Sequence, residues 1–250
     1  MPLRDHFHGQ TEIELPWPMI AQSWAITLVR WLNTTLPRNQ FQAVSEMRMG
    51  PQVEADVAEY RRDEIPDPHY GPNGSVATLT VAPPAVITIP AIFPDEIEVE
   101  VRERRAGRPL VGIIELVSPG NKDRESACDS FVAKCVAYLR RGIGVVIIDV
   151  VTERHANLHN ELMQAIGGTN PHLMPDTPTY VSGYRPVHRQ AGGNGGASPR
   201  AAGANEIEVW PYAATVGQPV PAVPLGLRGG PVVLLDLEGT YTAAIEATGL

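Results

Sequence analysis

The sequence has little cysteine and no long hydrophobic run. Cys128 and Cys135 are its two cysteines, seven residues apart on a predicted helix, which separates them by roughly 10 Å, beyond the reach of a disulfide. Two buried thiols in a reducing compartment are expected. No apolar run is long enough to span a bilayer, and residues 1–9 lack the hydrophobic segment of a signal peptide. These features predict a cytoplasmic protein without a membrane partner.

Lysine is nearly absent as well. Of the 20 basic side chains, only Lys122 and Lys134 are lysine, and the rest are arginine. Arginine keeps its proton near neutral pH, whereas lysine can lose it and carries a compact charge. The two lysine positions are therefore candidates for sites that need lysine. The net charge is −8, so contact with nucleic acid would require a local basic patch.

Hydrophobic residues make up 43% of the chain and charged residues 19%, which predicts a sizeable core. Residues 110–117 and 143–151 are continuous apolar runs, typical of strands buried on both faces. The predicted helix between them makes a crossover, so the two strands should be parallel. Residues 97–104 alternate apolar and charged residues, which predicts a half-exposed strand. Further helices are predicted over 16–36, 153–166 and 240–248, and further strands over 40–49, 53–60, 86–92, 206–210 and 232–237.

The predicted fold class is α/β, with a Pro-rich C-terminal extension. Residues 1–182 would form the core, residues 183–205 a flexible Gly-rich loop, and residues 206–250 late strands and a short helix that pack on the core. The tryptophans of the first long helix are expected in the core rather than on a base-stacking surface.

Glu115 is the most informative residue for function, because it stands in an otherwise apolar strand. A buried carboxylate is costly unless it is paired, protonated or bound to a metal. Asp56, in the predicted strand 53–60, is the expected partner. Two such carboxylates can hold Mg²⁺ or Mn²⁺, which polarises a phosphoryl oxygen and activates water. A nearby lysine would stabilise negative charge. The alternative is that Glu115 pairs with Arg or Lys for purely structural reasons.

The segment IIELVSPGNKDR, followed by KCVAYLRRGIGVVIIDVV, resembles the Uma-two type of restriction-endonuclease-like proteins. The chain is also similar to the bacterial family called domain of unknown function four-zero-five-eight. That second resemblance includes Ser118, Pro119, Asn121 and Lys122, an Asp-Val strand like that at Asp56, and the C-terminal segment VGQPVPAVPLGLRGGPVVLLDLEGTY. It covers nearly the whole chain.

The resemblance implies a PD-(D/E)XK nuclease-like core, a mixed sheet flanked by helices, and a metal site. Asp56 and Glu115 would be its acidic ligands and Glu46 a third. Val117 stands where this fold usually has lysine. Lys134 on the following helix is the favoured substitute, ahead of Lys122 in the loop.

Other patterns carry weaker signals. His155 and His159 share a face of a predicted helix and could bind zinc, although a solvated face is the favoured interpretation. A local basic patch for a nucleic-acid backbone could come from Arg102, Arg104, Arg105, Arg108, Arg140 and Arg141. Asp149 is expected to cap or pair locally. Ser118 lacks the context of a serine nucleophile.

Two functions are consistent with these patterns. The first is a Mg²⁺- or Mn²⁺-dependent nuclease that acts on DNA or RNA. The second is a binding or scaffold protein on a degenerate nuclease fold, favoured by Val117 and by the acidic net charge. The sequence leaves a homodimer open in both.

Overall fold

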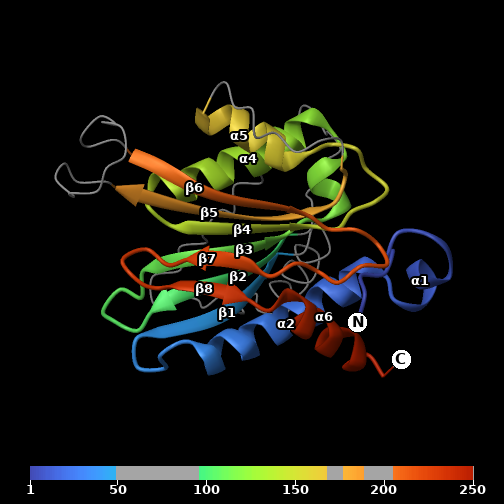
Figure 1. Ribbon diagram of the computed structural model, residues 1–250, viewed down its shortest axis with the longest axis horizontal. Helices are drawn as coiled ribbons and strands as arrows, with labels where there is room; N and C mark the ends of the chain where they lie inside the picture. Colours follow the sequence, from blue (N-terminus) through green and yellow to red (C-terminus); the bar gives the residue numbers. More distant parts are fainter. Residues whose placement is uncertain (49–95, 168–176, 189–204, 250) are drawn as a thin grey trace, which may run out of the picture. The chain divides into compact units, whose positions relative to one another are not determined.

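The computed structural model describes residues 1–48, 96–167, 177–188 and 205–249 (Figure 1). Over these ranges the protein is an α/β structure with a six-stranded mixed sheet, a two-stranded sheet and flanking helices. Asp56 and the strands predicted over 53–60 and 86–92 lie outside the described residues.

The six strands of the large sheet lie side by side in chain order. β3 and β4 are parallel, as the crossover predicted, and every other neighbouring pair is antiparallel. The strands are β1 (Phe41–Arg48), β2 (Glu96–Glu103), β3 (Leu110–Leu116), β4 (Gly144–Asp149), β5 (Tyr180–His188) and β6 (Asn205–Ala213).

Helices cover both sides of this sheet (Figure 1). α4 (Glu125–Arg140) and α5 (Leu158–Gly167) pack together on one side. α2 (Trp17–Thr35) and α6 (Leu237–Glu246) pack together on the other. The short helices α1 (Gly9–Glu14) and η1 (Pro119–Lys122) precede α2 and α4, and β7 (Val223–Gly226) pairs with β8 (Val232–Leu235).

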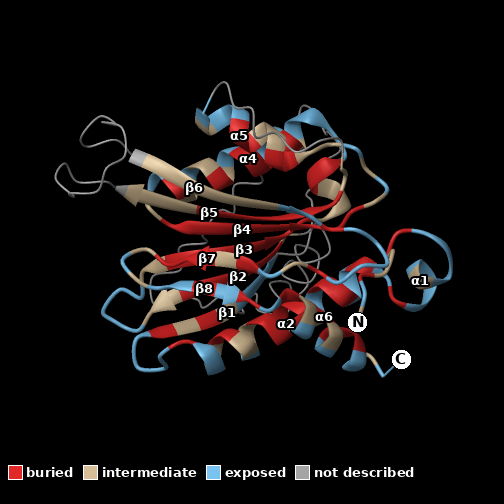
Figure 2. Ribbon diagram, in the orientation of Figure 1, coloured by how far each residue is buried: buried red, intermediate tan, exposed pale blue. Residues whose placement is uncertain are grey.

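The core contains the elements that the apolar runs predicted. β4 is buried along its whole length, and β3 from its second residue onward (Figure 2). Cys128 and Cys135 are buried free thiols on α4, as predicted. Trp17 and Trp24 are buried, and the indole N–H of Trp24 donates to Thr240 Oγ1 at 3.0 Å. The tryptophan stripe is therefore a core feature at these two positions.

The segment that was predicted as a loop from Gly183 onward begins inside a strand. β5 continues to His188 and pairs along its length with β6, which completes the sheet. Glycine is required at 183 for packing, because a Cβ there would lie 2.4 Å from the carbonyl oxygen of Pro224 on β7. Glycine at 183 therefore marks a close approach of two strands, whereas the Gly-rich residues 192–196 of the predicted loop lie outside the described residues.

The strand predicted as half-exposed is buried on both faces over its centre. Glu98 and Glu100 of β2 are buried along with the apolar residues between and beside them. Alternation of apolar and charged residues usually marks one wet face, but here both faces of β2 are covered. No helix in the described ranges has the length and apolar character needed to cross a membrane.

Candidate functional site

A row of three glutamates crosses neighbouring strands of the sheet. The strand registers place Glu46 of β1 opposite Glu98 of β2, and Glu98 opposite Glu115 of β3. Directly opposed residues project from the same face with Cβ atoms about 5 Å apart. Glu98 and Glu115 are buried, whereas Glu46 is exposed. The fold thus gathers carboxylates on the face covered by α4.

Lys134 brings a single cation to this row. Its Nζ lies 2.7 Å from Glu98 Oε1, 3.0 Å from Glu115 Oε2 and 3.6 Å from Glu96 Oε2. Its side chain is 20% exposed, so the ammonium group remains next to solvent. Lys134 therefore reaches Glu115 from the flank of the buried stripe of α4, as its helical position indicated. We call Glu96, Glu98, Glu115 and Lys134 the carboxylate–lysine cluster.

The electrostatics of this cluster are dominated by burial. Burial raises the pKa of Glu115 to about 8, against the lowering effect of Lys134 and with a further rise from Glu98. For Lys134, burial acts to lower the pKa, but Glu115 and Glu98 outweigh it and raise the pKa above its ordinary value. Lys134 therefore stays protonated, and Glu115 is the member that can gain or lose a proton near neutral pH.

One oxygen of Glu115 is left over. Oε2 accepts from Lys134, but Oε1 is buried and has no hydrogen-bond partner among the described residues. An unsatisfied buried carboxylate oxygen costs free energy unless another group binds it. Carboxylate oxygens are the ligands that Mg²⁺ and Mn²⁺ prefer. Glu115 and Glu98 thus present the donor chemistry of a divalent-cation site.

The described residues do not form a metal cage by themselves. Within the four described ranges, no three histidine, cysteine or acidic side chains are grouped so that they could hold a metal ion. Glu46, the third acidic ligand that the resemblance implies, is exposed on the edge strand β1. A site with two protein carboxylates is still chemically adequate, because Mg²⁺ commonly keeps waters and binds substrate phosphates.

Lys122 lies in a different buried pair. Its Nζ is 3.0 Å from Asp149 Oδ2 and donates to the carbonyl oxygen of Pro178 at 2.9 Å. Both charged side chains of the pair are fully buried. Burial raises the pKa of Asp149 to about 6, although Lys122 acts to lower it. Lys122 therefore joins the end of β4 to the segment before β5, and it pairs with Asp149 rather than Glu115.

Val117 occupies the position, two residues after Glu115, at which the resemblance would place a lysine. It is fully buried, its N–H donates to the carbonyl of Ile148, and its own carbonyl accepts from the indole of Trp17. The position is thus used to join β3 to β4 and to α2.

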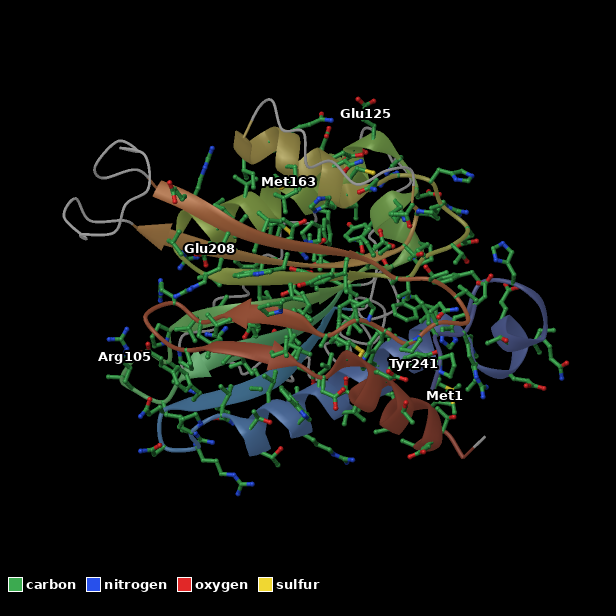
Figure 3. All side chains as sticks on the ribbon, in the orientation of Figure 1. Met1, Arg105, Glu125, Met163, Glu208 and Tyr241 are labelled. Atoms are coloured by element: carbon green, nitrogen blue, oxygen red, sulfur yellow. The ribbon has the colours of Figure 1, made fainter. Side chains whose placement is uncertain are left out.

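The arginines of the predicted basic patch are occupied near the β2–β3 turn. Arg102 pairs with Glu100, Arg105 with Glu103, and Arg108 donates to Gln42. This turn lies at the opposite end of β2 from Glu98, five residues or roughly 17 Å away. Figure 3 labels Arg105 at its tip. These side chains are therefore poorly placed to serve the carboxylate–lysine cluster.

The two histidines do not share a helix face. α5 begins at Leu158, so His155 precedes it. His159 is buried, and its Nδ1 lies 2.5 Å from the hydroxyl of Tyr184. The expected solvated face is wrong for His159, because a side chain of α5 at this position points into the core between α5 and β5.

Glu98 and Glu96 are site residues that the sequence pattern did not reveal. Alternation along β2 made them resemble solvent-facing charges, and only the strand register places Glu98 beside Glu115. The available signal was the accumulation of glutamates at 96, 98 and 100, opposite a strand that contains a single carboxylate.

Comparison with known proteins gives this chain no family. A scan against protein-family models, a search of curated proteins and a search of solved structures each found no match.

Proposed function

We propose that this protein is a divalent-metal-dependent phosphodiesterase that cleaves DNA or RNA, with its centre at Glu98, Glu115 and Lys134. The observation that carries the proposal is the buried oxygen Glu115 Oε1, which lacks a partner among the described residues while Oε2 binds Lys134. The proposal makes this oxygen a metal ligand.

The order of elements supports this proposal. A long helix, antiparallel strands that carry the paired carboxylates, a crossover helix that carries the lysine, and a parallel strand follow one another along the chain. This is the arrangement that the resemblance to PD-(D/E)XK proteins leads us to expect. Glu98 lies beside Glu115 in this arrangement, and Asp56, which the resemblance makes a ligand, lies outside the described residues.

Each residue has a distinct task in the proposed reaction. The carboxylates of Glu98 and Glu115 would hold the metal, which would supply Lewis-acid chemistry toward a phosphoryl oxygen. Lys134 orients the attacking water and stabilises the charge that develops on the phosphoryl group. Because the pKa of Glu115 is about 8, metal binding would displace a proton from it over part of the physiological range.

A closed ion cluster in a binding or scaffold protein is the second candidate. Glu115 and Glu98 are almost fully buried, and Lys134 alone already contacts three carboxylates. A cluster of this kind can hold α4 on the sheet with no catalytic role. The burial of these residues therefore supports a structural role in a binding or scaffold protein.

Cleavage distinguishes the two functions. Single- and double-stranded DNA and RNA are incubated with wild type, Glu115→Gln and Glu12→Gln, in Mn²⁺, in Mg²⁺ or in EDTA. Glu12 is an exposed residue of α1 and serves as the matched control. If the protein is a nuclease, wild type and Glu12→Gln should cleave in a metal-dependent way. The cleavage rate of Glu115→Gln should be at least about 100-fold lower. Folded wild type that cleaves none of these substrates favours the scaffold protein.

A further inference from the structure

A cavity of about 550 Å³ lies at the end of the sheet where α4 ends and β4 begins. It is lined by residues of α4, α5, β5 and β6 and by the turn between β7 and β8. Figure 3 labels Glu208 of β6 and Arg105 on this side of the molecule. The volume falls within the range of small-molecule sites.

Three arginines meet at this cavity. Arg140 comes from the last turn of α4, Arg185 from β5, and Arg228 from the β7–β8 turn. The acidic residue among the described lining residues is Glu206. Glu208 also pairs with Arg185, and the three arginines still leave a net positive charge at the cavity, in a chain whose total charge is −8. Such local reversal of charge favours an anionic ligand.

Two of these arginine side chains pack directly against the backbone of glycine residues. A Cβ on Gly226 would lie 2.6 Å from Cγ of Arg185, and a Cβ on Gly142 would lie 3.3 Å from Cδ of Arg228. The arginine stems thus lie flat on positions that have no side chain. This placement limits the directions available to both guanidinium groups, and it lowers the entropy cost of ligand binding.

The guanidinium groups keep donors for a ligand. Arg185 donates one hydrogen bond to Glu208 at 3.3 Å, and Arg228 donates one to the carbonyl of Arg141 at 3.2 Å. The side chain of Arg140 makes no hydrogen bond or ion pair within the described part of the chain. Because each guanidinium carries five N–H donors, most remain for the oxygens of a phosphate or carboxylate.

The rest of the lining is apolar. Leu139 of α4, Ile166 of α5 and Ile207 of β6 are among the side chains that line the cavity. Such a lining would bind an apolar group attached to the anion. A long polyanion is disfavoured, because it would also meet the acidic remainder of the protein, whereas a small ligand meets only the local charge.

We infer that this cavity binds a small organic phosphate or carboxylate, with its anionic group on Arg140, Arg185 and Arg228 and its apolar part on the α4–α5 side. The cavity is separate from the carboxylate–lysine cluster. Lys134 precedes Arg140 by six residues, or roughly 9 Å along α4.

Phenyl phosphate is a suitable probe, because it combines one phosphate with one apolar ring. Its binding is titrated by calorimetry in EDTA and compared with inorganic phosphate and with phenol. We expect phenyl phosphate to bind with a Kd of about 1 mM or lower. It should bind at least about tenfold more tightly than inorganic phosphate or phenol, because each of these lacks one of its two contacts.

Arg140→Gln and Arg30→Gln provide the matched comparison. Both arginines are exposed helix residues, and neither side chain has a hydrogen-bond or ion-pair partner in the described ranges, so neither substitution should unfold the protein. Arg140→Gln should weaken phenyl phosphate binding about tenfold, and Arg30→Gln should leave it unchanged. Glu115→Gln should also leave it unchanged, so this inference can fail or succeed separately from the nuclease.

Three results would overturn the inference. The first is no phenyl phosphate binding by folded wild type. The second is equal binding by wild type and Arg140→Gln. The third is displacement of phenyl phosphate by a short single-stranded oligonucleotide that itself depends on Arg140, since this would assign the arginines to a nucleic-acid backbone.

Discussion

Lys134 Nζ lies 2.7 Å from Glu98 Oε1, although the two residues are 36 positions apart and on different elements. The same nitrogen lies 3.0 Å from Glu115 Oε2. One cation on α4 thereby neutralises charge on two neighbouring strands. The proposed metal chemistry and the attachment of α4 to the sheet both depend on this contact.

Removal of the cation should destabilise the fold. Lys134→Met leaves Glu98 and Glu115 buried without their positive partner, and we expect a loss of about 3 kcal/mol in the free energy of unfolding. Urea unfolding measures this loss. Above pH 8, where Glu115 is ionised, the double variant Lys134→Met/Glu115→Gln should recover part of the loss, because one of the buried charges is gone. Equal stability of the single and double variants would contradict a coupled cluster.

The raised pKa of Glu115 predicts a pH dependence of stability. Because the folded-state pKa of about 8 is above the ordinary value of 4.5, the folded state holds this proton more tightly than the unfolded state. The contribution is fully present below about pH 4.5 and is lost as the pH rises through 8.

Glu115→Gln cannot lose a proton in this window. Its stability relative to wild type should therefore increase steadily from pH 5 to pH 8, as measured by urea unfolding at each pH. A difference between the two proteins that stays constant with pH would show that Glu115 is ionised throughout.

Lys122 should matter for stability and not for metal binding. The Lys122–Asp149 pair is fully buried, so Lys122→Met should cost about 3–5 kcal/mol. At temperatures where the Lys122→Met protein is still folded, it should bind Mn²⁺ with the same affinity as wild type. Lys122→Met/Asp149→Asn is the control, and it should be more stable than Lys122→Met. Selective loss of Mn²⁺ binding in a folded Lys122→Met protein would assign this lysine to the metal site.

Gly144 is the position where β4 and β7 approach most closely. A Cβ there would clash with the backbone carbonyl group of Gly226, so the two strands would have to separate. Gly144→Ala should cost about 3 kcal/mol or more, like other overpacked core positions. At Gly167, at the end of α5, a Cβ would meet no atom of the described residues within 4 Å, and alanine should be neutral or slightly stabilising. Thermal unfolding compares the two variants.

The sequence predicted the central part of the fold better than its edges. The apolar runs around Glu115 and Val146 gave β3, β4 and their parallel crossover, because strands buried on both faces leave a strong pattern. β5 was not predicted at all, and its part from Gly183 onward was assigned to a loop, because glycine that allows close packing looks the same in sequence as glycine in a loop.

The sequence predicted two members of the carboxylate–lysine cluster and missed a third, because only a local pattern can be recognised in sequence. Glu115 and Lys134 stood out as a carboxylate in an apolar strand and a rare lysine near it, and the structure brings them together. Glu98 did not stand out, because its position beside Glu115 is set by the strand register over a separation that a local pattern does not carry. Asp56 lies outside the described residues, so its role as a ligand stays a prediction.

Mn²⁺ binding, measured by electron paramagnetic resonance, is the decisive experiment for the proposed metal centre, since it requires no substrate. Wild type is compared with Glu98→Gln, Glu115→Gln and the exposed control Glu12→Gln, each confirmed as folded. A metal centre at Glu98 and Glu115 predicts one Mn²⁺ bound by wild type and by Glu12→Gln, with affinity reduced about tenfold or more by each of the other two substitutions. Wild type without Mn²⁺ affinity, or with affinity that Glu98→Gln and Glu115→Gln leave unchanged, would contradict a metal centre at these two residues.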